Sequence, residues 1–327
     1  MSEIKNRSEL VFLYDIKDAN PNGDPLDENK PRIDEETGIN LVTDVRLKRT
    51  IRDYLHNFKK QEIFVREIED ENGHIQDAKL RAEDFLIKDG KSVSKSSIKL
   101  PEMKKIIDEN VLKECIDVRL FGVTMPLEKD PKNKSSITHT GPVQFKIGRS
   151  LHRVFTKHFR GTGAFASKKG AEQKTFREED FLPYSLICFY GIINENAAKE
   201  TKMTEEDVKL LVDGIWNGTK NLISRSKAGQ VPRLLMKVNY TEENYHVGDL
   251  NSMLKLSADV PEDEIRDISQ FKIDVTELIN TLSGNKDKIQ SVEYKVDGRL
   301  NLLCNGNKCT MAECFKESGI ITKDIVL

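Results

Sequence analysis

The chain has 327 residues, of which 32% are charged, with 52 lysines and arginines against 54 aspartates and glutamates. This near balance excludes a uniformly basic protein, so any contact with nucleic acid must be local. The five cysteines are irregularly spaced and no signal-like segment follows Met1, which predicts reduced thiols in a cytoplasmic protein. No apolar run reaches the roughly 20 residues that span a bilayer, so no membrane partner is expected.

The first predicted elements are a strand and a helix. Residues 9–16 (ELVFLYDI) predict a buried strand, and Asn-Pro and Asn-Gly turn signals end it. A helix follows from Asp44, with Thr43 as its N-cap. At about 100° per residue, one side of this helix is apolar and the opposite side is cationic. The apolar side comprises Leu47, Ile51, Tyr54, Leu55 and Phe58, and the cationic side comprises Lys48, Arg49, Arg52, His56, Lys59 and Lys60.

Positive charge is concentrated where this helix begins. Arg46, Lys48 and Arg49 lie in the first two turns, where the helix dipole and the unpaired amides disfavour cations. A bound phosphate would relieve this, so the helix is a candidate phosphate-binding element. The alternative is a solvated face that Asp44 and Asp53 partly neutralise, and the helix alone does not decide between the two.

The remaining elements predict an α+β fold. Residues 61–110 are polar and irregular, with a hairpin signal at Asn72-Gly73, and this is typical of an insertion. Further predicted elements are a helix at 101–120 closed by Phe121-Gly122, strands at 141–147, 184–193 and 233–240, and a helix at 205–222. The order βαββαβ is ferredoxin-like or RRM-like, with helices on one sheet face and a surface often used for RNA. Because this topology hosts many chemistries, function has to be argued from the residues.

Four motifs resemble the backbone subunit of the CRISPR Cascade complex, a crRNA-binding protein of the RAMP superfamily. They are ELVFLYDIKDANPNGDP at 9–25, TDVRLKRTIRDYL at 43–55, DVRLFG at 117–122 and THTGPVQFKIGRS at 138–150. The resemblance is to the type I-B kind, and the type I-C subunit shares the first two motifs. It implies a non-catalytic protein without a cofactor, whose copies polymerise along one crRNA. The guide bases would pair with target DNA, and other Cascade subunits would be further partners.

The same resemblance divides the chain into five parts. It implies a palm with the RNA-binding helix at 1–60, a finger-like insertion with its return helix at 61–120, a palm strand region at 121–153, a thumb-like basic loop at 154–180, and the remaining palm with a C-terminal extension at 181–327. It assigns guide-phosphate contacts to Asn20, Asn22, Thr43, Lys48, Arg49 and Arg52, with Arg46 as an added cation. Lys48 and Arg52 are one turn apart on the same side, so they can grip neighbouring phosphates.

The thumb-like segment is strongly basic. Residues 146–177 contain nine lysines and arginines against the single acid Glu172, a net charge of +8, whereas residues 259–277 contain seven acids and two bases. Phenylalanines at 155, 159, 165 and 176 alternate with these cations, as in proteins that unstack nucleotides, and glycines favour a mobile loop. Phe155 and Phe159, at i and i+4, are predicted to be core residues. Lys168 and Lys169 are candidates for RNA contact, as are Arg225 and Lys227 in the loop 224–230, where a plain connector is the alternative.

Catalytic alternatives have weaker support. Asp18, Asp24 and Asp27 in the first loop would suit a metal-dependent ribonuclease of the related type III backbone kind, although turns also favour aspartate. His139, His152 and His158 would suit acid–base ribonuclease chemistry, but their spacing shows no partner. GTGAFASKKG lacks the spacing of a phosphate loop. Cys304, Cys309 and Cys314 recur every five residues without a CxxC pair, so they are a weak zinc candidate and no metal site is expected.

Overall fold

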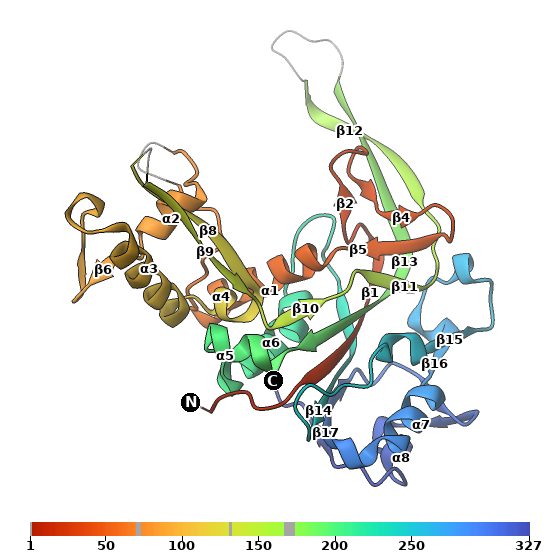
Figure 1. The fold of residues 1–327 in the computed structure, drawn as a ribbon. Helices are drawn as coiled ribbons and strands as arrows, with labels where there is room; N and C mark the ends of the chain where they lie inside the picture. The colour runs from red at the N-terminus through yellow and green to blue at the C-terminus, as the bar shows by residue number, and fades with distance from the viewer. Residues whose placement is uncertain (1, 70–72, 131–132, 167–173) are drawn as a thin grey trace.

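A large sheet forms the centre of the molecule. The computed structural model describes residues 2–69, 73–130, 133–166 and 174–327. A hairpin projects from this sheet, and an insertion stands apart from the sheet beside the hairpin (Figure 1). Ten strands form the sheet. They are β1 (Ser8–Ala19), β4 (Ile33–Asp34), β5 (Ile39–Val42), β10 (Val143–Phe145), β11 (Gly148–Arg153), β12 (Lys157–Ala166), β13 (Lys174–Ile193), β14 (Val231–Tyr240), β17 (Ile289–Val296) and β20 (Thr322–Asp324).

The middle of the sheet is antiparallel. β1 pairs with β13 on one side and with β14 on the other, and β10 pairs with the far side of β13, which gives the order β14–β1–β13–β10. The strands predicted at 9–16, 184–193 and 233–240 are therefore confirmed, whereas the one predicted at 141–147 is shortened to β10. The mixed α+β class is likewise confirmed.

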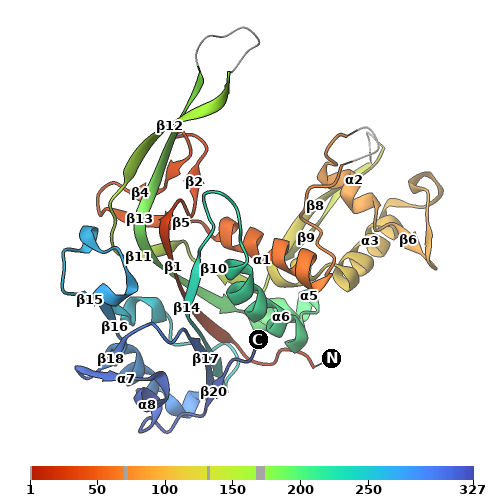
Figure 2. The same ribbon diagram turned by 180° about the vertical axis from the view of Figure 1, so that it is seen from behind.

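Two helices cover one face of this sheet. α1 (Asp44–Lys59) lies beside α6 (Glu205–Asp213), which continues as a π-helical turn at Gly214–Gly218 (Figure 2). A Cβ at Gly214 would lie 2.9 Å from a methyl carbon of Ile51, so the close approach of the two helices requires glycine there. The short helix α5 (Glu195–Thr201) precedes α6. None of the helices in the described ranges is long and apolar enough to cross a membrane.

The opposite face is covered by the C-terminal unit. Along β1, Leu10 and Phe12 belong to the core under α1 and α6, whereas Val11 and Leu13 belong to a second core. This C-terminal unit contains β15 (Lys255–Ala258), β16 (Phe271–Asp274), α7 (Thr276–Gly284), β18 (Leu302–Cys304), β19 (Asn307–Cys309) and α8 (Met311–Phe315). The sheet surface that RRM-like proteins often use for RNA is thus covered by the chain itself, so a ligand has to bind elsewhere.

The insertion has its own core. It contains α2 (Ala78–Glu83), the ribbon β6 (Ile87–Lys88) and β7 (Lys91–Ser92), α3 (Leu100–Glu114), α4 (Ile116–Phe121) and the hairpin β8 (Gly122–Asp130) and β9 (Asn133–Thr140). The single helix predicted at 101–120 is wrong, because Cys115 is extended and pairs with Glu62. Its predicted end at Phe121-Gly122 is confirmed. The hairpin at 122–140 has no counterpart among the predicted elements.

The predicted thumb-like loop contains a β-hairpin. β12 pairs with the first part of β13 and projects from the sheet, although a mobile loop was expected from its glycines. Phe155 and Phe159 are each 48% exposed, so the prediction that they are core residues is wrong. Phe159 lies on the projecting hairpin and stacks on Phe181, whereas Phe155 precedes β12 and has the guanidinium of Arg266 5.7 Å from its ring centre. Lys168 and Lys169 lie outside the described residues, as do the side chains of Phe165 and Phe176.

Candidate nucleic-acid interface

Three segments that are far apart in the sequence meet where α1 begins. Asn22, in the loop after β1, accepts hydrogen bonds at Oδ1 from both the backbone N–H and the hydroxyl of Thr43, at 2.9 Å each. The Thr43 hydroxyl in turn accepts from the backbone N–H of Arg46 at 3.3 Å, which confirms the predicted N-cap. The backbone N–H of Asn20 donates to the carbonyl of Ser226 at 2.8 Å. The loop after β1, the start of α1 and the loop 224–230 are thereby joined.

Asn20 is held firmly in this junction. Its residue surface is only 4% exposed, and its side-chain amide donates to the carbonyl of Asn29 at 2.7 Å. That bond supports the short ribbon of β2 (Gly23–Asp24) and β3 (Lys30–Pro31). Asn20 and Asn22 therefore shape the junction.

Two partly buried cations, Arg46 and Lys227, belong to the segments that meet at this junction. Arg46 donates from its guanidinium to the Thr50 hydroxyl at 3.1 Å, and its Nε is buried without a partner. Lys227 donates to the hydroxyl of Ser226 at 3.1 Å. Burial lowers the pKa of both side chains, and the charge of Arg46 lowers the pKa of Lys227 further.

Neither of these cations forms an ion pair with a residue in the described ranges. Asp53, the acid that favours the charge of Arg46, is itself paired with Arg49 at 2.8 Å. Partial burial of two like charges is unfavourable unless an anion compensates them. The pair Arg46–Lys227 therefore has the electrostatics of an anion site.

Two other cations in the first turns of α1, Lys48 and Arg49, are paired with acids. Lys48 contacts Asp44 at 3.0 Å and Gln144 at 3.3 Å, and Arg49 contacts Asp53. This is the neutralised arrangement that the sequence left open as an alternative. Phe58, predicted on the apolar side, is 58% exposed and stacks on Tyr54, so its predicted burial is wrong.

Arg52 holds the insertion against α1. Its Nε donates to Asp117 at 3.0 Å, and its side chain is only 13% exposed. Asp117 is fully buried and also accepts from the backbone N–H groups of Phe64 and Val65, at 2.8 and 3.1 Å. The guanidinium lies 5.1 Å from the centre of the Phe121 ring. Asp117 lies in the DVRLFG motif, but its burial depends on residues more than fifty positions away.

Arg225 connects the loop 224–230 to the hairpin. Its guanidinium contacts the carboxylate of Glu179 on β13 at 2.8 Å, and the two side chains are 62% and 37% exposed. Lys227 on the same loop donates to Ser226, whose backbone carbonyl binds Asn20 of the junction. One loop thus contributes a cation to the junction and another to the hairpin.

The hairpin carries a stacked aromatic pair, Phe159 and Phe181, of which Phe159 is exposed. The rings of Phe159 and Phe181 stack with centroids 5.1 Å apart, and the ammonium of Lys157 lies 5.2 Å from the centre of the Phe159 ring. Aromatic rings flanked by cations are typical of single-strand nucleic-acid binding.

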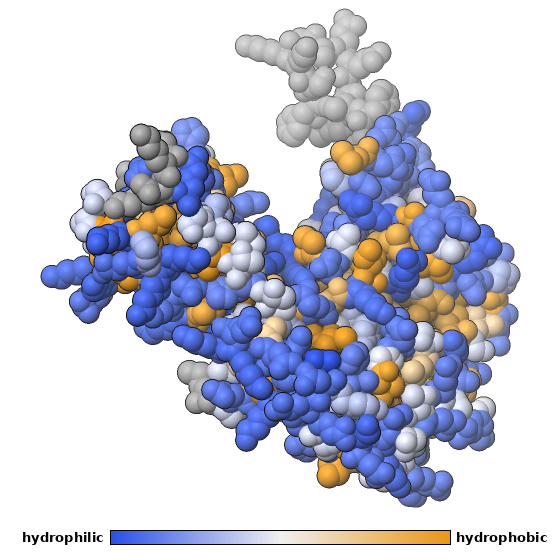
Figure 3. Space-filling view, in the orientation of Figure 1, coloured by the Kyte–Doolittle hydropathy of each residue, from blue (hydrophilic) through white to orange (hydrophobic). Residues whose placement is uncertain are grey.

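The surface is hollowed between the insertion and the hairpin. Figure 3 shows this hollow in the orientation of Figure 1, where α1 lies at its floor. Hydrophilic residues dominate the walls of the hollow. The junction at the start of α1 therefore opens between the insertion and the hairpin.

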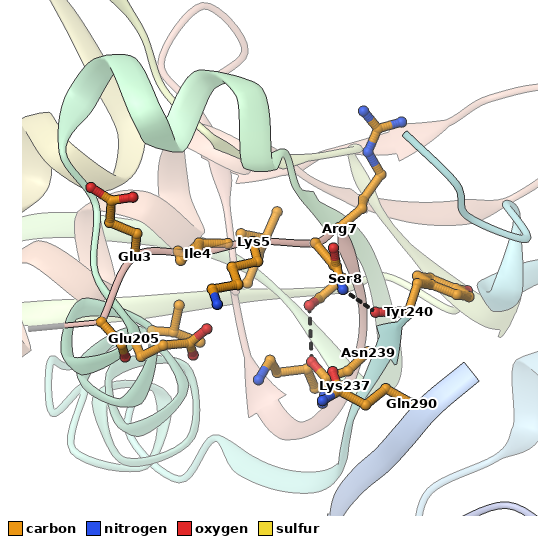
Figure 4. A pocket seen from close by; sticks show the side chains of 14 residues that line it. Glu3, Ile4, Lys5, Arg7, Ser8, Glu205, Lys237, Asn239, Tyr240 and Gln290 are labelled. Atoms are coloured by element: carbon orange, nitrogen blue, oxygen red, sulfur yellow. Dashed lines mark hydrogen bonds between the residues drawn. The ribbon is translucent and has the colours of Figure 1, made fainter. Parts of the chain in front are cut away.

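A second hollow lies far from this junction. A cavity of about 260 Å³ is lined by Ser2–Ser8, the end of β14 and the start of α6 (Figure 4). It contains both lysines and glutamates, among them Lys5, Lys237, Glu3 and Glu205. It adjoins the first residue of β1, whereas the junction follows the last, and a twelve-residue strand separates them by roughly 35 Å. Its mixture of cations and acids also distinguishes it from the Arg46–Lys227 pair.

Two of the three acids considered for a metal-dependent ribonuclease form ion pairs within the first loop. Asp24 contacts Arg32 at 2.9 Å and Asp27 contacts Lys30 at 2.8 Å. Within the described ranges, no group of three or more histidine, cysteine, aspartate or glutamate side chains is arranged to hold a metal ion, and this applies to Cys304, Cys309 and Cys314 as well. All five cysteines are free thiols.

The three histidines have separate partners. His139 contacts Asp108 at 2.5 Å on the insertion, and His158 contacts Asp180 at 3.2 Å on the hairpin. His152 is buried on β11, where its ring nitrogens bond to backbone groups. The histidines therefore form no shared acid–base pair.

The fold of this chain is similar to that of chains in two solved structures. Two chains of solved structures, described as a CRISPR RNA-guided surveillance complex in a pre-nicking state and a CRISPR RNA-guided surveillance complex, align with TM-scores of 0.53 and 0.50. The alignments cover 96% and 92% of this chain and 99% and 95% of those chains, each at 11% identity. The fold is thus shared with chains of such complexes.

The family follows from the sequence comparisons. The family model described as CRISPR-associated protein Cas7 matches residues 6–276. A protein of Haloferax volcanii named CRISPR-associated protein Cas7 is 36% identical over 312 residues, which cover 91% of this chain and 88% of that protein. The chain belongs to the Cas7 family. This confirms the family that the sequence motifs indicate. The confirmation applies to the family and not to the type I-B or type I-C kind.

Proposed function

We propose that this chain is the non-catalytic, guide-RNA-binding backbone subunit of a CRISPR Cascade complex of the type I-B kind. Its membership of the Cas7 family supports this role. The observation that carries the proposal is the pair Arg46–Lys227, two partly buried cations without an acidic partner in the described ranges.

One guide phosphate would bind between Arg46 and Lys227. Thr43 and Asn22 fix the start of α1, so they position Arg46 and keep the helix-start amides directed at the anion. None of these groups reads a base, as a guide-holding protein requires. Exposed Arg49 and Arg225 would contact neighbouring phosphates after exchanging their present partners. Lys168 and Lys169 would add further phosphate contacts. Lys48 would contribute positive charge to the floor of the hollow between the insertion and the hairpin. Arg52 would hold the insertion in place through its bond to Asp117.

The parts of the fold take the roles that the resemblance implies. The strands β14–β1–β13–β10 with α1 and α6 form an RRM-like palm, and the insertion is the finger. The hairpin β12–β13 is the thumb, and its Phe159–Phe181 pair stacks against guide bases. Bases outside that contact pair with target DNA. Copies of the chain associate head to tail along the RNA, next to other Cascade subunits.

Binding of a labelled oligouridine to the full chain tests this proposal. The double variant Arg46→Met, Lys227→Met is expected to weaken binding and to reduce the slope of log affinity against log salt by about 0.7 per lost phosphate contact. Fluorescence anisotropy at several salt concentrations measures both, and Lys308→Met, an exposed lysine on β19, is the matched control. An unchanged slope in the double variant contradicts the assignment of this site.

The same protein preparation tests the competing function. Incubation of the guide-loaded assembly with complementary RNA and Mg²⁺ is expected to leave that RNA intact. Cleavage that Asp24→Ala abolishes would instead identify a metal-dependent ribonuclease.

A further inference from the structure

The ion pair between Arg225 and Glu179 lies at the entrance to the proposed guide site. Its carboxylate comes from the hairpin, and its guanidinium comes from the loop that also supplies Lys227. The backbone of that loop is fixed by the bond from Asn20 to Ser226, so Arg225 stays next to the phosphate site. In the chain without RNA, a glutamate is therefore paired with one of the cations that are expected to bind phosphate.

The register of the hairpin shows which side Glu179 occupies. Glu179 pairs with Phe159, whereas its neighbours Glu178 and Asp180 pair with Arg160 and His158. Successive residues of a strand point to opposite faces, so Glu179 shares a face with the exposed aromatic ring. Glu178 lies on the other face, where it contacts Arg160 at 2.6 Å. Two adjacent glutamates thus form similar ion pairs on opposite sides of one strand.

A carboxylate and a phosphate make the same demand on a guanidinium. Both offer two oxygen acceptors to its planar donors, so Glu179 and a phosphate compete for Arg225. On the basis of the proposed function, we propose that Glu179 holds the place of a guide phosphate on Arg225 and weakens the binding of any RNA until it is displaced.

The consequence is a threshold for binding. An RNA that reaches only Arg225 has to displace Glu179 without gaining other contacts that offset the lost ion pair. An RNA that also reaches Arg46 and Lys227 gains those contacts and displaces the carboxylate as it settles.

Anisotropy titrations of the full chain with a labelled oligouridine test this inference. Glu179→Gln is expected to bind about two- to fivefold more tightly than wild type, the range that follows from an exposed ion pair. Glu178→Gln, which removes the same charge on the opposite face, is the matched control and is expected to show a smaller gain. In an Arg225→Met background the gain from Glu179→Gln is expected to disappear, because the two residues act as a pair.

Three outcomes distinguish the possibilities. Equal gains in Glu178→Gln and Glu179→Gln reveal a general charge effect and overturn the inference. A gain that persists in the Arg225→Met background overturns it as well. If wild type shows no salt-dependent binding of the oligouridine, the proposed function fails and this inference fails with it.

Discussion

The role of Arg52 is the sharpest test of how α1 is used. Arg52→Met removes the guanidinium from a fully buried carboxylate while keeping an apolar stem against Phe121. Breaking a buried ion pair typically costs about 3–5 kcal/mol. Asp117 keeps two backbone donors, from Phe64 and Val65, so the loss lies at the low end, about 3 kcal/mol of unfolding free energy.

The measurement has to locate the loss as well as size it. Amide hydrogen exchange is expected to show faster exchange at Phe64 and Val65 in Arg52→Met, because these amides donate to Asp117. Urea unfolding gives the overall change in stability. Arg49→Met is the control on the same helix, since its exposed pair with Asp53 is worth at most about 0.5 kcal/mol.

The opposite result would refute this reasoning. If Arg52→Met leaves exchange and unfolding unchanged but reduces the salt slope of RNA binding by about 0.7, Arg52 is a phosphate ligand. The bond to Asp117 would then be incidental. If both properties change together, the variant Asp117→Asn separates them, because it disturbs the buried pair and leaves the guanidinium in place.

Two further predictions concern other parts of the site. Burial holds the pKa of His152 below its usual 6.5, so the unfolded chain binds more protons just below pH 6.5 and stability is lost as the pH falls. Thermal melting between about pH 7 and pH 5 measures this loss, and a slope equally steep in His152→Gln would contradict it. Phe159→Ala is expected to weaken oligouridine binding by about 1–3 kcal/mol with little change in melting temperature. Phe155→Ala, with a similar exposure, is its control, and equal losses would argue against stacking on the Phe159–Phe181 pair.

Elements with strong local signals were predicted well from the sequence. β1 follows from its apolar run, and α1 follows from the Thr43 cap and the amphipathic pattern. The break at Cys115 was missed because it depends on pairing with Glu62, which lies over fifty residues away. The exposure of Phe58, Phe155 and Phe159 was missed because a pattern of apolar residues does not show whether another layer covers them.

The candidate site was predicted in its parts and not in its assembly. Arg46 and Lys227 were both named from sequence, yet only the fold brings them together. The cationic face of α1 looked available because Asp117, the partner of Arg52, is 65 residues away in the sequence. Charge alone does not show which cations already have a partner.

The enclosure of β1 also bears on how this chain can change over evolutionary time. Every residue from Ser8 to Ile16 is buried, and side chains of alternating direction fill two different cores. A substitution at any of these positions disturbs one core or the other, so we expect this strand to drift very slowly among descendants. The projecting hairpin, and the part of the insertion that packs on its own core, are where new lineages have room to diversify.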